Sequence, residues 1–431
     1  MPARMKLNSV LFPLLTAAAL IFQVLDPSTI WKALLVTFGG AWFIAWTWAS
    51  VLKNNLRIVR EVRYDWAQVG DTLEEQFTLT NDGVFPAAWV EVQDHSTLPN
   101  YSAARATGAG GNETNVWHTT GVCTHRGVYT LGGTTLQSGD PFGIYTVEVD
   151  QPESSTLVVM PPVIPLPAIE VMPGGWAGDG RSRSNSLEQT VNVSNVHEHQ
   201  QGEPLKMIHW PTSAKHRKLY TRVLDSSPSS DWWIVLDADA AVQAGRDWEA
   251  TLELGVILAA SLTARGLSAR HSVGLLSNGL NHGQTVWIKP QANEPHRLQI
   301  MRSLAMLQTG TLPLEELLER AAPALGQRAS MILITPSIKT DWLSPLTRLW
   351  WKGISPTVLL MDPSTFGSSQ SADSFAEVLT EMGIPRFVLG RDLLQRSEAN
   401  PTLRQNEWRI MPTGKAVATR PQQDIDWRRL G

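Results

Sequence analysis

Four histidines lie within twenty residues of one another and form the densest group of potential metal ligands: His197, His199, His209 and His216. Imidazole nitrogen is a good ligand for Zn²⁺. His197 and His199 are two residues apart, so on a strand both would lie on one face. No cysteine or carboxylate pattern completes a recognised zinc site around them. The spacing therefore favours histidines carried on a structural segment over a zinc centre.

The same stretch carries a cluster of positive charges. Its cations are Lys206, Lys215, Arg217, Lys218 and Arg222, set against Glu198 and Glu203. These cations can neutralise phosphates, but binding through phosphates alone is non-specific and salt-sensitive. The whole chain holds 36 Lys and Arg against 40 Asp and Glu, a net charge of −4 that gives no wider basic face. We therefore expect no nucleic acid, and assign the cluster to an anionic membrane surface or an acidic protein partner.

The sequence lacks signatures of covalent catalysis and of phosphate-binding loops. Ser213 and His216 are three residues apart, but no third residue or nucleophile elbow accompanies them. The glycines of "GDG" at 178–180 lack the lysine and the strand–helix setting of a phosphate loop. A single cysteine, Cys123, rules out an intramolecular disulfide. We predict no catalytic residue and no enzyme activity.

Two uncharged apolar stretches occur near the N-terminus, residues 7–25 and 33–52. As helices rising ~1.5 Å per residue, each would extend about 28–30 Å, which matches a hydrocarbon core of ~30 Å. Pro27 lies between them and favours a tight turn. We expect a transmembrane helical hairpin over residues 1–55. A secretory signal peptide has a similar apolar core, but the second full-length stretch argues against one.

Positive charges flank the expected hairpin at both of its outer ends. They are Arg4 and Lys6 before the first stretch, and Lys53, Arg57, Arg60 and Arg63 after the second. The short connection between the stretches holds only Lys32 and Asp26. Because Lys and Arg concentrate on the cytoplasmic side of membrane proteins, we expect both termini in the cytoplasm. The expected location is the cell (inner or plasma) membrane, crossed by two helices.

Short alternating segments separated by Gly, Pro and Asp follow over residues 56–167. "LRIVREVRYDW", "TLEEQFTLTN" and "AAWVEVQD" show the two-residue alternation of strands, and "NDG" at 81–83 is a turn signal. Repeated strands at this spacing predict an antiparallel β-sandwich domain. Residues 100–115 are expected to form a polar loop between strands. The Pro-, Gly- and Ser-rich composition of residues 168–195 predicts a linker.

Apolar strands alternate with helices from residue 231 to 395. "DWWIVLDADA" opens with a buried strand, and "SMILITPS" and "SPTVLLMD" are further strands. This rhythm predicts a mostly parallel sheet covered by helices on both faces. Ligands of such sheets bind beyond the carboxyl ends of the strands, so "DADAA" at 237–241 is expected at the site-forming edge. Residues 396–431 are expected to add one strand and a polar tail.

Two motifs resemble a known protein family. "RGVYTLGGTTLQSGDPFGIY" (126–145) and "GEPLKMIHWPTSAKHRKLYTR" (202–222) are similar to segments of bacterial membrane proteins of the domain of unknown function 58 family. The second motif resembles the family's defining segment, placed here within residues 196–230. The matching residues are Gly202, Glu203, Pro204, Lys206, Ile208, His209, Trp210, Lys215, Arg217 and Arg222. In the family Arg and Tyr are more usual where His197 and His199 stand, which also argues against zinc.

The resemblance implies that residues 231–395 form an α/β domain similar to the von Willebrand factor type A fold, which is Rossmann-like. That fold often holds Mg²⁺ through a D-x-S-x-S motif after its first strand, because carboxylates and hydroxyls supply hard oxygen ligands. The matching positions here are Asp237, Asp239 and Ala241, so one serine is a carboxylate and the other has no ligand atom. We expect a degenerate site in which Asp237 orders a loop. The alternative is Mg²⁺ held by Asp237 and Asp239 with water.

The resemblance also implies a function, because members of this family are often encoded beside MoxR-type AAA+ ATPases. We therefore expect a membrane-anchored cytoplasmic scaffold or accessory protein that mediates protein–protein interaction, with such an ATPase as partner in complex assembly or activation. In this hypothesis Trp210 is the apolar anchor of the defining segment and the cations form its solvent-facing edge. The alternative is a metal-dependent enzyme that uses Asp237, Asp239 and the nearby histidines.

Overall fold

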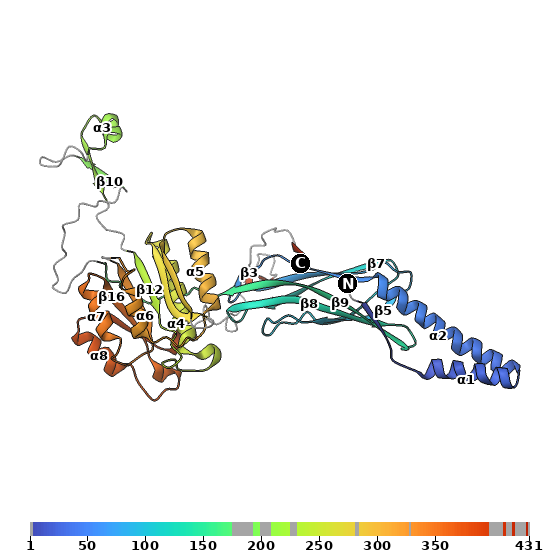
Figure 1. Cartoon of the computed structure of the whole chain (residues 1–431). Helices are drawn as coiled ribbons and strands as arrows, with labels where there is room; N and C mark the ends of the chain where they lie inside the picture. Colours follow the sequence, from blue (N-terminus) through green and yellow to red (C-terminus); the bar gives the residue numbers. More distant parts are fainter. Residues whose placement is uncertain are drawn as a thin grey trace. The chain divides into compact units, whose positions relative to one another are not determined.

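The computed structural model divides the chain into two compact units (Figure 1). The first comprises Met1–Pro162 together with Gln395–Gly431, and the second comprises Val163–Leu394. The structure describes residues 3–174, 193–198, 208–224, 231–280, 284–326, 329–395, 408–410, 416–418 and 428–429. Each unit buries an apolar core of its own.

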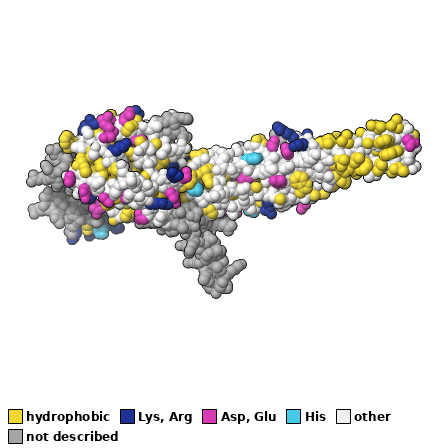
Figure 2. Space-filling model, turned by 90° about the horizontal axis from the view of Figure 1, so that it is seen from below, with side chains coloured by type: hydrophobic (Ala, Val, Ile, Leu, Met, Phe, Trp, Pro, Cys, Tyr) yellow, Lys and Arg dark blue, Asp and Glu magenta, His cyan; other side chains and the backbone are white. Residues whose placement is uncertain are grey.

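Two apolar helices lie near the N-terminus of the first unit, α1 (Leu11–Leu25) and α2 (Thr29–Asn55). They pack against each other, and the rings of Phe22 and Trp31 stack with their centroids 4.7 Å apart. Apolar side chains cover most of the surface of these two helices (Figure 2). Among the described helices, α2 is the one that is both long and apolar enough to cross a membrane. Helix α1 is apolar but only 15 residues long.

The outer ends of the helix pair differ from the predicted bounds. The prediction starts the first helix at residue 7, but β1 (Ala3–Leu7) pairs antiparallel with β9 (Tyr145–Met160), and α1 begins only at Leu11. The second helix runs on to Asn55 because its last turns pack into the β core, where Ala45, Ala49 and Leu52 are fully buried. Since β1 precedes α1 and α2 leads directly into β2, both outer ends of the helix pair lie beside the same β-sheets.

The β region consists of two antiparallel sheets that share one core. One sheet has the order β1-β9-β8-β5-β6, with β3 pairing parallel to β9, and the other has the order β20-β2-β4-β7. Their further strands are β2 (Leu56–Val62), β3 (Trp66–Gln68), β4 (Thr72–Asn81), β5 (Ala87–Asp94), β6 (Arg105–Ala109), β7 (Glu113–Val122), β8 (Gly127–Gly139) and β20 (Arg428–Arg429). Phe77 of β4 and Val90 of β5 meet in this core, so the predicted antiparallel β region is confirmed.

The expected loop over residues 100–115 contains a strand. Strand β6 pairs antiparallel with β5, and β7 already begins at Glu113. Small residues allow the close approach, because a Cβ at Gly108 would come within 3.0 Å of the carbonyl oxygen of Ala88. The Gly/Ala-rich composition that suggested a loop instead lets this edge strand lie close to its neighbour.

A buried group of charges lies inside the β region. The Arg60 guanidinium donates to both carboxylate oxygens of Glu75, at 2.9 and 2.6 Å, and to Asp94 Oδ1 at 2.7 Å. Burial alone would raise the pKa of Asp94, but the Ala103 N–H, the Arg60 charge and the Ser96 hydroxyl outweigh it and lower that pKa. The stability from this carboxylate is therefore present at neutral pH and is lost as the pH falls through the lowered pKa.

We expect Arg60→Met to destabilise the β region by about 3–5 kcal/mol, because it leaves two buried carboxylates without their cation. Thermal and denaturant unfolding of the full chain in detergent measures the change. Arg63→Met is the matched control. Arg63 also pairs with a glutamate, Glu74, at 3.2 Å, but the two side chains are 22% and 35% exposed. The control should cost about 1 kcal/mol or less, and an equal loss in both variants would contradict the buried-charge argument.

The second unit contains a six-stranded sheet in the order β14-β13-β12-β15-β16-β17. The strands are β12 (Trp232–Leu236), β13 (Val273–Leu280), β14 (Gln284–Gln291), β15 (Ser330–Thr335), β16 (Ser355–Met361) and β17 (Arg386–Leu389). In chain order this is 3-2-1-4-5-6, a doubly wound arrangement. Strand β14 is antiparallel to β13 and the other pairs in this sheet are parallel. The predicted α/β region is confirmed. Strand β14 was not predicted, because Lys289, Pro290 and Gln291 weaken its apolar pattern.

Helices cover both faces of this sheet. They are α4 (Thr251–Ser268), α5 (Glu294–Met306), α6 (Leu314–Ala321), α7 (Leu343–Trp351) and α8 (Asp373–Glu381), with 3-10 turns at Asp247–Glu249, Pro363–Phe366 and Arg391–Leu393. Trp233 and Val235 of β12 pack among residues of α6, α7 and α8. Trp232 and Leu236 face α4, where Gly266 and Gly255 leave room for their side chains. Successive β12 side chains thus enter opposite layers, as the pleat of a strand requires.

Smaller elements complete the described chain. In the second unit β10 (Val193–Glu198) pairs antiparallel with β11 (Tyr220–Leu224), and α3 (Trp210–His216) precedes β11. In the first unit β18 (Trp408–Ile410) pairs with β19 (Ala416–Ala418).

Candidate functional site

The carboxyl edge of the α/β sheet gathers polar side chains from three neighbouring strands. Asp237 follows β12, Asn278 lies near the end of β13, and Thr335 ends β15. All three side chains are fully buried. Asp237 Oδ2 accepts a hydrogen bond from the Thr335 hydroxyl at 2.7 Å, and Asp237 Oδ1 accepts a weaker one from Asn278 Nδ2 at 3.4 Å. The carboxylate at this edge is therefore enclosed by donors from the protein itself.

The loop after β12 is held by the same carboxylate. The Asp239 N–H donates to Asp237 Oδ1 at 3.1 Å, and Asp239 Oδ1 accepts a hydrogen bond from the Ala241 N–H at 3.0 Å. Gly310 lies against this edge, where a Cβ would approach the Asn278 carbonyl oxygen to 1.9 Å, so only glycine fits. Asp237 and Asp239 both order the loop backbone in this arrangement.

Asp237 and Asp239 do not by themselves supply the ligand set of a magnesium site. Mg²⁺ prefers an octahedron of oxygen ligands, but Ala241 offers none and both Asp237 oxygens already accept hydrogen bonds from the protein. Burial raises the pKa of Asp237 to about 6, although donors from Thr335, Asp239 and Asn278 oppose that rise. Among the described residues, no group of three or more His, Cys, Asp or Glu side chains could hold a metal ion.

The expected histidine cluster is only partly described. His209 caps α3, since its Nδ1 accepts a hydrogen bond from the Thr212 N–H at 3.4 Å and lies 2.7 Å from the Thr212 hydroxyl. His216 is exposed at the other end of α3, with its ring 5.6 Å from that of Tyr220. His197 lies in β10, whose backbone alone is described. The structure thus gives His209 a structural role.

Several residues of the family-like segment lie outside the described residues or are described only in their backbone. Those outside are His199, Gly202, Glu203, Pro204 and Lys206, and Arg222 is described only through its backbone in β11. Of the others, Ile208 is buried, whereas Trp210, Lys215 and Arg217 are exposed. Trp210 is 63% exposed. Trp210 was expected to be an apolar anchor, but it is not buried against any described part of the chain.

Sequence reasoning found Asp237 and Asp239 but missed Asn278, Thr335 and Gly310. The sequence did carry a signal for Asn278 and Thr335. Each lies at or near the end of an apolar strand, in "GLLSNG" and "MILITPS". Carboxyl ends of parallel strands meet at one edge of a sheet, so those polar residues could have been placed beside Asp237. Gly310 had no such signal, because its role depends on a long-range approach to Asn278.

Comparison with known proteins gives one family match. Residues 195–364 match the family described as "Protein of unknown function DUF58". This match supports the DUF58 family for that part of the chain, which includes α3 and the Asp237 edge. No curated protein matches the chain.

Solved structures give only weak similarities. The CARDB domain of a Pyrococcus furiosus protein is 14% identical with a TM-score of 0.19, covering 24% of this chain and 94% of that one. An alkylpurine DNA glycosylase from Pseudomonas fluorescens is 10% identical with a TM-score of 0.18, covering 33% of this chain and 42% of that one. A β-glucosidase from Listeria innocua is 8% identical with a TM-score of 0.17, covering 24% of this chain and 16% of that one. Scores this low carry no argument about fold or function.

We expect Asp237→Asn to remove a pH dependence of stability. The folded pKa of about 6 lies above the ordinary value of 3.8, so the folded state binds the proton more tightly. Stability therefore falls as the pH rises from about 4 to 6, by on the order of 3 kcal/mol, and the penalty persists above that range. Denaturant unfolding of the full chain in detergent between pH 4.5 and 7.5 measures this slope.

A companion variant tests the cause of the shift. Thr335→Val removes the hydroxyl that stabilises the ionised carboxylate, so the pKa of Asp237 should rise further and the slope should extend to higher pH. If Asp237→Asn left the slope unchanged, Asp237 would not be its source.

Proposed function

We propose that the protein is a membrane-anchored scaffold or accessory protein whose α/β unit binds a protein partner in the cytoplasm. The partner is a MoxR-type AAA+ ATPase acting in complex assembly or activation. The observation that carries this proposal is the surface of α3. Trp210 is 63% exposed, and the cations Lys215 and Arg217 on the same short segment are exposed as well. Exposed tryptophan is the residue type that most often dominates binding energy at protein interfaces, and the cations suit an acidic partner surface.

Two further features support a binding module. The doubly wound sheet order and the loop after β12 are compatible with the type A-like domain that the family resemblance implies. The carboxylates at that loop accept hydrogen bonds from backbone N–H groups, as Asp239 does from Ala241. This arrangement favours a structural loop over a metal-dependent active site. The segment with α3 lies inside the part of the chain that matches the DUF58 family.

We expect Trp210→Ala to weaken binding of the purified, detergent-solubilised protein to a MoxR-type AAA+ ATPase by about 30-fold or more, as for an interface hot spot of at least ~2 kcal/mol. Biolayer interferometry with the immobilised full chain measures the affinity.

Trp351→Ala is the matched control, because Trp351 is 81% exposed at the end of α7. Its replacement should leave the affinity within about twofold, since surface substitutions away from an interface have small effects. No binding of the ATPase by the unaltered protein, or equal losses in the two variants, would refute the proposed contact.

We further propose that α1 and α2 both insert in the membrane and that the rest of the protein faces the cytoplasm. Pairing of β1 with β9 supports a common side for the two outer ends of the helix pair. Lys53 and Arg57 follow the apolar part of α2, whereas the connection between the helices has only Asp26 and Lys32. This distribution fits a cytoplasmic β region under the positive-inside rule.

Reporter fusions test this topology. A reporter that fluoresces only in the cytoplasm should be active after residue 60, and a periplasmic phosphatase fused there should be inactive. The same pair inserted between Asp26 and Ser28 should give the reverse result. A phosphatase active after residue 60 would overturn the cytoplasmic orientation.

A further inference from the structure

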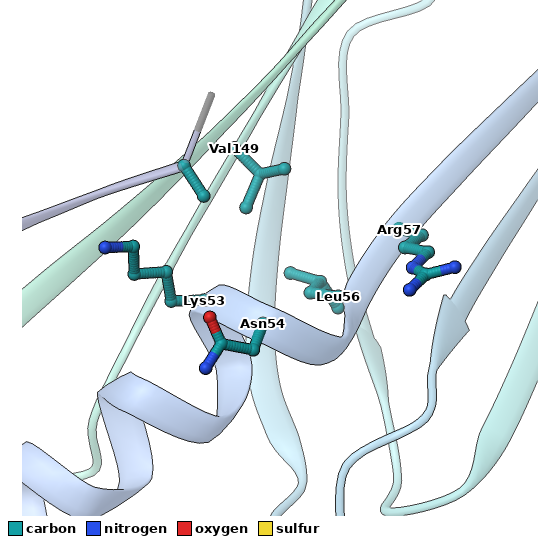
Figure 3. Close-up of a pocket in the computed structure, with 6 residues that line it drawn as sticks. Lys53, Asn54, Leu56, Arg57 and Val149 are labelled. Carbon is teal, nitrogen blue, oxygen red and sulfur yellow. The ribbon is translucent and has the colours of Figure 1, made fainter. Parts of the chain in front are cut away.

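A depression of about 400 Å³ lies where α2 passes into β2, and its charged lining residues are both cations. It is lined by Ala3, Lys53, Asn54, Leu56, Arg57 and Val149. Figure 3 shows Lys53 and Arg57 on opposite sides, with Asn54 and Leu56 between them. The depression thus presents two positive charges and an amide above the core residues Leu56 and Val149.

The two cations are not neutralised within the described part of the chain. No carboxylate lines the depression, and among the described residues neither Lys53 nor Arg57 has an ion-pair partner. Glu148 and Asp150 both adjoin the lining residue Val149 on β9, so their side chains point to the opposite face of that strand. An anion in the depression would meet positive charge without a competing carboxylate.

The depression also lies at the depth of a lipid headgroup if α2 is embedded as proposed. Trp46 is 47% exposed, and tryptophan collects at the membrane interface. Lys53 is seven residues further along α2, about 10 Å at the helical rise, and a lysine stem can bend back toward the interface. The loop at 82–86 packs against this end of α2, with Trp48 stacked on Phe85 at 4.6 Å, and presents Val84 with 78% exposed. An exposed valine beside the end of an apolar helix is consistent with a β region that touches the membrane surface.

We propose that this depression binds the phosphate headgroup of an acidic membrane phospholipid. Lys53 and Arg57 bind the phosphate oxygens from two sides, and the Asn54 amide donates a hydrogen bond. The inference rests on the proposed membrane anchoring but not on the proposed ATPase partner.

A purely local role for Lys53 is the main competing explanation. Lys53 lies in the last turn of α2, where a cation stabilises the helix end. That role needs neither Arg57 nor a lipid, and it predicts a change of stability without any preference among headgroups. The test must therefore compare lipids as well as variants.

The experiment measures binding of the full chain to nanodiscs or vesicles of phosphatidylcholine with and without phosphatidylglycerol, and counts bound phosphatidylglycerol by native mass spectrometry. A direct charge-assisted hydrogen bond from each cation to the phosphate contributes at least about fivefold. We expect Lys53→Gln/Arg57→Gln to lower the preference for phosphatidylglycerol about 30-fold and to leave binding to phosphatidylcholine unchanged. Lys53→Arg/Arg57→Lys should retain at least a third of the preference.

Arg4→Gln/Lys6→Gln is the matched control. It removes the same charge from β1, but Arg4 and Lys6 alternate with Ala3 and therefore lie on the face of β1 away from the depression. An equal loss in this control would indicate diffuse surface electrostatics and overturn the proposal. Displacement of the lipid by millimolar inorganic phosphate would assign the site to free phosphate, and would overturn it too. If the unaltered chain did not bind to phosphatidylcholine membranes at all, the membrane anchoring itself would be refuted.

Discussion

The packing of the last turns of α2 into the β-sandwich is the contact on which the first unit depends. Ala45, Ala49 and Leu52 are fully buried in the same core as Phe77 of β4. Two of the three are alanines, so the helix backbone can approach the sheets closely. Because α2 passes into β2 without a linker, the rotation of the helix also fixes which residues of β2 face inward. Arg60 is one of them, and its buried partners Glu75 and Asp94 must then come from β4 and β5.

This packing divides α2 into parts with different surroundings. The last turns are held by the β core, whereas Phe43, Ile44 and several preceding apolar residues such as Ile30 and Val36 are exposed, as are most of those of α1. Soluble proteins rarely leave so large a contiguous apolar surface in water. The proposed membrane anchoring would supply an apolar environment for this surface. The packing of Ala45–Leu52 against the β core would then fix the distance of the β region from the membrane surface.

Periodicity made the architecture predictable, and long-range contacts limited the detail. Apolar strands alternating with helices indicated the α/β region, and Asp237 could be placed at the edge of its sheet because it directly follows β12. The start of α1 could not be predicted, since the choice of strand over helix for residues 3–7 depends on β9, some 140 residues away. The burial of Arg60 could not be predicted either. Its strand has an ordinary alternating pattern, and its partner Asp94 comes from another strand 34 residues away. At the candidate site the sequence identified both carboxylates, but the hydrogen bonds from Thr335 and Asn278 to the Asp237 oxygens depend on the fold.

The pairing of β1 with β9 has a consequence for synthesis. Residues 3–7 leave the ribosome early, but their partner is complete only when residue 160 has been made. At roughly 5–20 residues per second, the first strand waits on the order of ten seconds without a partner. During that time both apolar helices have emerged, and under the proposed membrane anchoring the N-terminal segment must stay on the side where β9 will appear. Closure of the sheet then ties the two outer ends of the helix pair together, which under the proposed membrane anchoring would happen after the helices have inserted.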